Sequence, residues 1–251
     1  MKRHDTTDLG GGNRAFEETW WTEILHARSP DTQVRRRAVA NISARYWKPV
    51  YSYVRCRRID PEKAKDLVQG FFAKVVLGRN LIGRADPAEG RFRTYLLTAL
   101  DRYMKSVHRE TSAKKRAPEG GLLHLEGFED PALFEPVDCS TPEMAFHRQW
   151  VSGLLDQAIA EVREWYLKGG KEGHWNVFRA VVLAPILEDA PVPSLAEVSD
   201  QFGIGGKDKA EDMLLTVKRR FQKVLRNRVR LLVASDDEVD REIREMTQAL
   251  S

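Results

Sequence analysis

The 251-residue sequence predicts an all-α protein, made of two helical domains that an acidic linker joins. Apolar residues recur at steps of three and four through most of the chain, which is helical spacing. No segment shows the sustained apolar–polar alternation that a half-buried strand requires. Basic and acidic residues are also segregated into blocks, although the net charge is only +4. A length of 251 residues accommodates two ordinary domains.

The predicted organisation follows from shifts in composition along the chain. The amino terminus is polar and glycine-rich, and we expect it to be disordered. The segment after the first domain contains several acidic residues and no lysine or arginine, which is typical of an extended linker. The expected boundaries are 1–12 for the disordered terminus, 13–116 for the first helical domain, 117–140 for the linker, 141–234 for the second helical domain and 235–251 for an acidic helix.

Helix boundaries in the first domain are marked by proline and aspartate. Helical spacing runs through 33–57, and Pro49 inside that run should kink the helix or mark a boundary. Asp60 is a good N-cap and Pro61 suits a first helical position, so the next helix should begin there and run to about Leu77.

A basic helix is predicted at Gly90–Arg116. Its apolar stripe consists of Phe92, Leu96, Ala99, Tyr103 and Val107. Basic and hydroxyl side chains share another face, which carries Arg91, Thr94, Thr98, Arg102, Lys105 and Arg109. Such a face can follow a phosphate backbone, although it is equally compatible with a solvated surface helix.

The second domain contains a predicted helix-turn-helix. Thr141 and Pro142 restart the helical pattern, and Ser194 is a plausible N-cap further on. Gly203 allows a sharp turn, and Ile204 should fill the core beneath it. The long helix that follows carries seven basic residues and no acidic one between 218 and 230. The closing acidic segment has Val239, Ile243, Met246 and Leu250 at helical spacing, so we expect it to pack back on the domain.

Several classes of chemistry find no support in the sequence. The six histidines are scattered, and no phosphate-binding glycine loop or nucleophile elbow is present. Cys56 and Cys139 are far apart and indicate neither a metal site nor a disulfide framework. We therefore expect no enzymatic activity, no cofactor and no metal. The sequence shows no secretory segment and no apolar run of membrane-spanning length, so a cytoplasmic location is the default expectation.

The sequence also resembles a known family. The segments RYWKPVYSYVR, DPEKAKDLVQGFFAKVV and GRFRTYLLTALDRYMKSVHR are similar to the second conserved region of bacterial sigma factors of the extracytoplasmic-function (ECF) type. The Thr141–Phe146 segment and the helix-turn-helix resemble the fourth region of that family. The resemblance covers about residues 35–110 and 141–233.

The resemblance implies a sigma factor that binds core RNA polymerase and directs it to promoter DNA, with a region 2-like bundle and a region 4-like domain. Polymerase contacts are implied for Arg57, Lys65, Asp66 and Gln69. Contacts to the minus-ten element are implied for Arg91, Arg93, Thr94, Tyr95, Thr98, Arg102, Lys105 and Arg109. Contacts to the minus-thirty-five element are implied for Lys207, Lys209, Lys218, Arg219 and Arg220.

Alternatives remain open at this stage. The chain could instead be a helix-turn-helix regulator that does not engage polymerase, or, with no catalytic residues to support it, a helical enzyme acting on nucleic acid. The Trp20–Trp21 helix and the acidic closing helix extend beyond the minimal family pattern. Our hypothesis is that these extensions occlude DNA or tie the domains together, as a built-in substitute for a separate inhibitor. Inhibition by a separate anti-sigma protein is the alternative.

Overall fold

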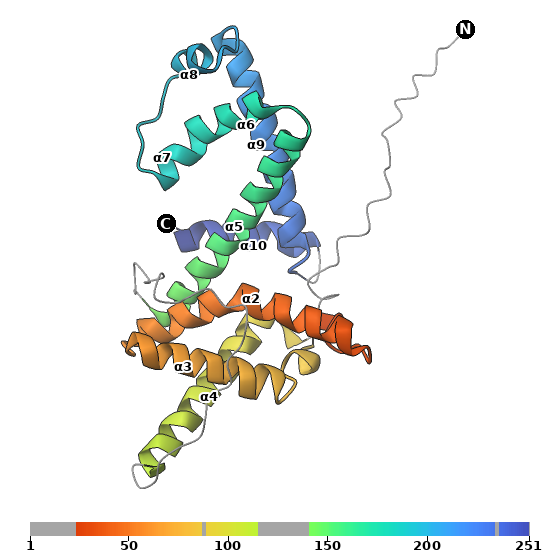
Figure 1. The fold of residues 1–251 in the computed structure, drawn as a ribbon, viewed down its shortest axis with the longest axis vertical. Helices are drawn as coiled ribbons and strands as arrows, with labels where there is room; N and C mark the ends of the chain where they lie inside the picture. The colour runs from red at the N-terminus through yellow and green to blue at the C-terminus, as the bar shows by residue number, and fades with distance from the viewer. Residues whose placement is uncertain (1–23, 87–88, 115–140, 234–235, 251) are drawn as a thin grey trace, which may run out of the picture.

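The computed structural model describes residues 24–86, 89–114, 141–233 and 236–250, and all regular secondary structure in these ranges is helical (Figure 1). The elements are α2 (Thr32–Cys56), α3 (Pro61–Phe71), η1 (Phe72–Leu77), η2 (Ile82–Arg84), α4 (Phe92–Lys114), α5 (Pro142–Lys168), α6 (Glu172–Phe178), η5 (Arg179–Leu183), α7 (Ala184–Leu187), α8 (Leu195–Phe202), α9 (Lys207–Arg230) and α10 (Asp236–Leu250). The predicted Trp20–Trp21 helix and the 117–140 linker lie outside the described residues.

Helix α2 begins at its N-cap, Asp31, whose carboxylate accepts hydrogen bonds from the Gln33 and Val34 amides. Of the two expectations for Pro49, the boundary is wrong, because Pro49 lies inside α2, a 25-residue helix that ends at Cys56. A proline inside a helix costs about 3 kcal/mol. Burial of the surrounding side chains offsets that cost, since most residues from Tyr46 to Val54 are inaccessible to solvent.

Helix α3 begins as predicted, with the Asp60 side chain accepting from the Glu62 amide and Pro61 in the first turn. The α-helical geometry ends at Phe71, and the last six residues to Leu77 form a π-helix, η1. A connecting loop that includes η2 then leads to α4. Arg28 donates to the Ala85 carbonyl and so ties this loop to the segment before α2.

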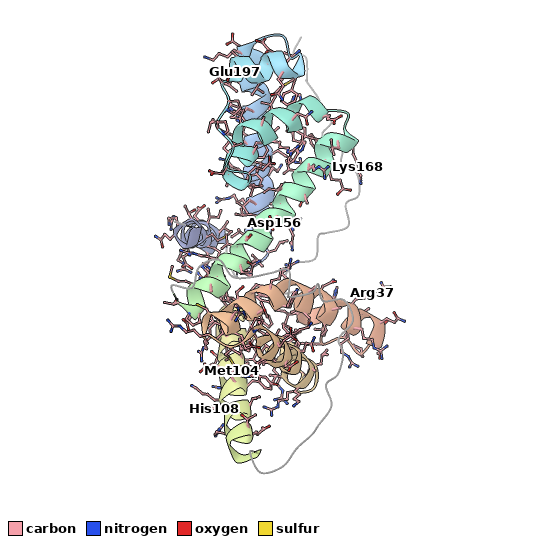
Figure 2. The ribbon with its side chains drawn as sticks, turned by 60° about the vertical axis from the view of Figure 1, so that its left-hand side comes forward. Arg37, Met104, His108, Asp156, Lys168 and Glu197 are labelled. Atoms are coloured by element: carbon pink, nitrogen blue, oxygen red, sulfur yellow. The ribbon has the colours of Figure 1, made fainter. Side chains whose placement is uncertain are left out.

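Helix α5 links the two halves of the molecule. Thr141 caps it through a 3.1 Å hydrogen bond from the Met144 amide, as the sequence predicts. The amino-terminal half of α5 packs on α2, and its far end packs on α6 and α9 (Figure 2, where Asp156 and Lys168 mark its middle and end). Trp150 and Val151 of α5 share one hydrophobic core with the helices of the first half.

A second core lies among α5, α6, α8 and α9. The predicted helix-turn-helix is formed by α8 and α9. Ser194 and Glu197 form a capping box at the start of α8. Gly203 ends that helix with a φ of 62°, in the left-handed region, and Ile204 is buried beneath the turn. These expectations are confirmed.

The acidic closing segment forms α10, which packs against both α5 and α9 (Figure 1). Val239 and Met246 belong to the first core, with Ile243 packed against it. The amphipathic helix predicted here is confirmed. Among the described helices, none combines the length and the apolar character that crossing a membrane would need.

Candidate nucleic-acid interface

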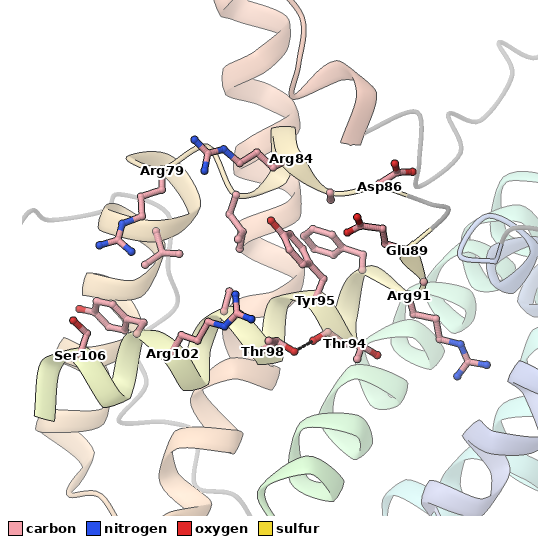
Figure 3. A pocket seen from close by; sticks show the side chains of 17 residues that line it. Arg79, Arg84, Asp86, Glu89, Arg91, Thr94, Tyr95, Thr98, Arg102 and Ser106 are labelled. Atoms are coloured by element: carbon pink, nitrogen blue, oxygen red, sulfur yellow. Dashed lines mark hydrogen bonds between the residues drawn. The ribbon is translucent and has the colours of Figure 1, made fainter. Parts of the chain in front are cut away.

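The first turns of α4 and the preceding loop enclose a pocket of about 730 Å³. Tyr95 and Arg102 rise from α4 toward the loop, and Arg84 approaches from the other side (Figure 3). Thr98 and Thr94 lie along the same face of α4 and are exposed. The pocket therefore combines an aromatic ring, guanidinium groups and hydroxyls, which suit an unstacked base and its phosphates.

Arg91 also borders this pocket, but its side chain extends away from it toward α10 (Figure 3). There it makes a two-pronged contact with Glu245, with Nη2 donating to Oε1 at 3.1 Å and Nη1 donating to Oε2. Its Nη2 also lies 3.1 Å from Oε2 of Glu242. The hydrogen bond from Arg91 is the main cause that lowers the pKa of Glu245.

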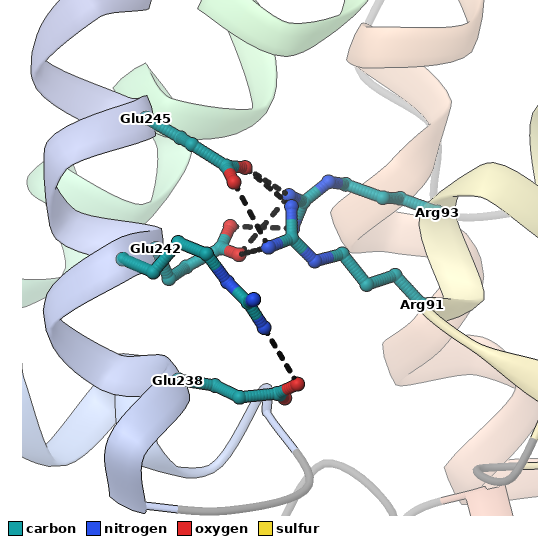
Figure 4. A network of polar contacts seen from close by, with 6 residues as sticks. Arg91, Arg93, Glu238, Glu242 and Glu245 are labelled. Atoms are coloured by element: carbon teal, nitrogen blue, oxygen red, sulfur yellow. Dashed lines mark hydrogen bonds and ion pairs between the residues drawn. The ribbon is translucent and has the colours of Figure 1, made fainter.

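Arg93 extends into the same cluster of charges (Figure 4). Its Nη2 donates to Oε2 of Glu242 at 3.1 Å, and its Nη1 lies 2.5 Å from Oε1 of that residue. Only 11% of the Arg93 side chain is exposed, and none of the Glu242 side chain is. We call Arg91, Arg93, Glu242 and Glu245 the α4–α10 charge cluster.

An aromatic residue of α5 completes the surroundings of Arg93. The guanidinium carbon of Arg93 lies 4.7 Å from the centre of the Trp150 ring, which is a cation–π contact. His147 stacks on Trp150, with ring centroids 5.6 Å apart. Burial lowers the pKa of His147, and the positive charge of Arg93 lowers it further. Arg93 is thus held by α5 and α10 together.

The rest of the predicted basic face of α4 lies toward its carboxyl end. Arg102, Lys105 and Arg109 are exposed. Lys105 pairs with Asp101 at 2.7 Å, and Arg109 donates through Nε to the Lys105 carbonyl at 3.3 Å. These cations are at the surface, within reach of a polyanion.

The residues expected to contact polymerase lie around the junction of α2 and α3. Arg57 donates to Asp101 at 2.8 Å and to the Tyr53 hydroxyl at 2.5 Å. Asp66 is exposed, and Lys65 and Gln69 are half-buried. Arg57 and Asp66 line one largely apolar groove of about 1130 Å³, which also includes Ile59, Leu67, Tyr103, Met104 and Val107. Lys65 and Gln69 lie outside that lining.

The basic residues of α9 divide into two groups. Lys207, Lys209, Lys218 and Arg219 are exposed. Arg220 instead stacks on Trp165, with 4.4 Å between its guanidinium carbon and the ring centre. Arg226 pairs with Asp240 at 2.5 Å, and Arg228 pairs with Glu161 at 2.6 Å. The uniformly basic stretch seen in the sequence is therefore partly used for internal contacts.

Glu242, Glu245 and Trp150 were not among the residues selected from sequence. The acidic character of the closing helix and the apolar face of α5 were visible there. The pairing of those carboxylates with Arg91 and Arg93 joins residues about 150 positions apart, and no local pattern reveals it.

The chain matches no protein-family model, no curated protein and no solved structure. Within the described ranges, no group of three or more histidine, cysteine, aspartate or glutamate side chains is placed to hold a metal ion.

Proposed function

We propose that this chain is a sigma factor of the ECF type, acting in the cytoplasm. It would bind core RNA polymerase, direct it to promoters and help to open the DNA. The observation that carries the proposal is the pocket at the start of α4. This helix comes after the DLVQGFF segment, from which η1 and the loop with η2 separate it, and it lies on the same chain as a helix-turn-helix.

The pocket would receive a base flipped out of the minus-ten element. Extrusion costs a few kcal/mol, which stacking on an aromatic ring and contacts to cations can offset. Tyr95 supplies the ring, and Arg102 supplies a charge beside it. Thr94 would donate a hydrogen bond to the strand, and Thr98, whose hydroxyl donates to the Thr94 carbonyl at 2.9 Å, would accept one. Lys105 and Arg109 would contact phosphates further along α4.

The groove lined by Arg57 and Asp66 would receive a helical element of the polymerase. Its lining combines apolar side chains such as Leu67 and Met104 with charged ones such as Lys63 and Asp66, and protein-docking surfaces combine the same two kinds of residue. Asp66 is exposed there, so it is available for an intermolecular contact. Lys65 and Gln69 would contribute from the adjoining surface of α3.

The helix-turn-helix would bind the minus-thirty-five element, with the exposed lysines at the start of α9 nearest to the bases. Asp208, Glu211 and Asp212 are exposed on the same turns. Carboxylates repel phosphates but accept hydrogen bonds from cytosine amino groups. We therefore expect a preference for cytosine on one strand of that element.

Binding to core polymerase tests the proposal. The Asp66→Ala/Gln69→Ala double variant should lose most of its affinity for core enzyme while keeping its helical content. Glu164→Ala is the control, because Glu164 is an exposed carboxylate near the far end of α5. If the protein is a regulator that does not engage polymerase, neither the parent chain nor its variants would bind core enzyme specifically. That result would reject the sigma proposal.

A further inference from the structure

Carboxylates of α10 form ion pairs with two arginines at the start of α4. Arg91 lies just before the helix, and Arg93 lies in its first turn. Helix α10 is held by apolar contacts on one side, where Val239 and Met246 are buried. The next side of the helix presents Glu242 and Glu245 to Arg91 and Arg93 (Figure 4). The helix thus places carboxylate oxygens on two arginines that the family resemblance assigns to the minus-ten element of DNA.

We propose that α10 is an intramolecular competitor of DNA, and that the molecule described here is the closed, inhibited form. The proposal rests on the proposed function, because it concerns the same site on α4. Oxygen atoms of Glu242 and Glu245 take the places of phosphate oxygens, and Arg91 and Arg93 can serve either the helix or the nucleic acid.

Burial makes the two states mutually exclusive. Arg93 is 11% exposed, between Trp150 on one side and Glu242 on the other. A phosphate group cannot reach this guanidinium while α10 is in place. Arg91 is more accessible, at 28%, but both of its terminal nitrogens already contact Glu245.

The closed contact is also imperfect, which favours exchange with a polyanion. Oε1 of Glu242 is buried and lies close to Arg93 Nη1, yet it accepts no well-directed hydrogen bond among the described residues. A buried carboxylate oxygen that lacks a directed donor is costly. The closed state retains that cost, whereas release of α10 returns the carboxylate to water.

The competition for Arg91 and Arg93 can be tested with a mixed-sequence single-stranded DNA oligonucleotide as the probe. The test variant is Glu242→Gln/Glu245→Gln, which removes both charges and keeps the side-chain shapes. The control is Asp237→Asn/Asp240→Asn, which removes two charges from the same helix at exposed positions. Asp240 pairs with Arg226 of α9, outside the α4–α10 charge cluster, and both side chains are more than half exposed. Loss of this exposed pair should therefore loosen α10 very little.

We expect the Glu242→Gln/Glu245→Gln protein to bind the oligonucleotide about tenfold more tightly than the parent chain, within the usual range of coupling between sites. The control should change affinity far less. Adding Arg91→Gln/Arg93→Gln to the test variant should remove the gain, because those arginines would then be absent from the DNA contact.

Two results would overturn the inference. One is an equal gain in both double variants, which would reflect net charge alone. The other is the absence of any gain in the test variant. Core-polymerase binding, measured on the same proteins, separates the two proposals. If the chain binds polymerase but the test variant binds the oligonucleotide no more tightly, only the inhibitory role of α10 is rejected. If the test variant binds the oligonucleotide more tightly but no chain binds polymerase, only the sigma function is rejected.

Discussion

Arg93 and Glu242 face each other between α4 and α10, with 2.5 Å between Nη1 and Oε1 and with the carboxylate fully buried. The contact joins the start of the candidate DNA-binding helix to the last described helix of the chain. In the inhibited form that we propose, this contact would make the DNA site on α4 depend on the position of α10.

This pairing predicts an asymmetry between the two glutamates. Removing one member of a buried ion pair leaves an uncompensated charge, which costs about 3–5 kcal/mol. Glu245 lies 3.5 Å from Arg93 and would compensate this charge only in part, so we expect Glu242→Ala to lower the free energy of unfolding by about 3 kcal/mol, the low end of that range. Glu245 is 38% exposed, so Glu245→Ala should cost about 1 kcal/mol or less. Urea denaturation of both variants measures the difference, and equal losses would contradict the burial argument.

A second prediction concerns Gly70, in the segment that resembles the family signature. A Cβ atom built at this position would lie 2.3 Å from the Tyr103 hydroxyl of α4. Alanine gains about 1 kcal/mol of helix propensity over glycine, but overpacking costs about 1–3 kcal/mol. We therefore expect Gly70→Ala to be destabilising by about 1 kcal/mol.

The Tyr103→Phe change removes the clashing oxygen and leaves the ring in place. The double variant Gly70→Ala/Tyr103→Phe should therefore recover the stability that Gly70→Ala loses. The thermal midpoints of the two single variants and the double variant measure this coupling. Strictly additive effects would mean that the close approach of the two helices does not limit position 70.

The two groups of basic residues on α9 give a third prediction. Lys218 and Arg219 are exposed, and each phosphate contact that is lost should flatten the salt dependence of duplex binding by about one unit of slope. Arg220 packs on Trp165, so Arg220→Ala should change the slope much less. Binding isotherms at several salt concentrations distinguish the variants. An equal change of slope in Arg220→Ala and Lys218→Ala would place both residues at the phosphates and contradict the packing role of Arg220.

A fourth prediction follows from His147. Burial lowers its pKa below the ordinary value of 6.5, and Arg93 and Arg91 add to the shift, while Glu242 and Glu245 oppose it. Below pH 6.5 the unfolded chain then binds this proton more readily than the folded chain does. The neutral form of His147 therefore contributes its full stability above pH 6.5. This contribution is lost as the pH falls from 6.5 through the lower pKa of the folded state.

The free energy of unfolding should accordingly decrease between pH 7.5 and 5.5, and it should decrease less in His147→Gln. His174 also has a pKa lowered by burial, but it is present in both proteins and cancels in the comparison. The Glu245 carboxyl titrates below 4.5, outside this range. An identical pH dependence of the two proteins would show that His147 does not contribute.

Local chemistry made parts of the fold predictable from sequence. The starts of α3, α5 and α8 depend on Asp60, Thr141 and Ser194, whose side chains hydrogen-bond to amides within three residues. The left-handed conformation at Gly203 is equally local. Pro49 was misleading as a possible boundary because burial around α2 outweighs the proline penalty, and burial depends on partners elsewhere in the chain.

The candidate site was predictable only in part, for the same reason. Helical spacing brought Thr94, Thr98 and Arg102 to one face, and all three line the pocket. Helical spacing alone did not indicate that Arg91 and Arg93 pair with carboxylates of α10. That pairing depends on the position of α10 in the fold, which is set by its packing on α5 and α9. The sequence hypothesis of an occluding extension receives support from the α4–α10 charge cluster, and the DNA-binding comparison above is its test.

Transcription by core polymerase tests the central claim most directly. Core enzyme would be incubated with fragmented genomic DNA, with and without this chain, and the 5′ ends of the transcripts mapped. We predict discrete new start sites that share an upstream sequence, that require the chain and that are lost with Asp66→Ala/Gln69→Ala. An unchanged pattern of 5′ ends, both with the parent chain and with Glu242→Gln/Glu245→Gln, would contradict the assignment as a sigma factor.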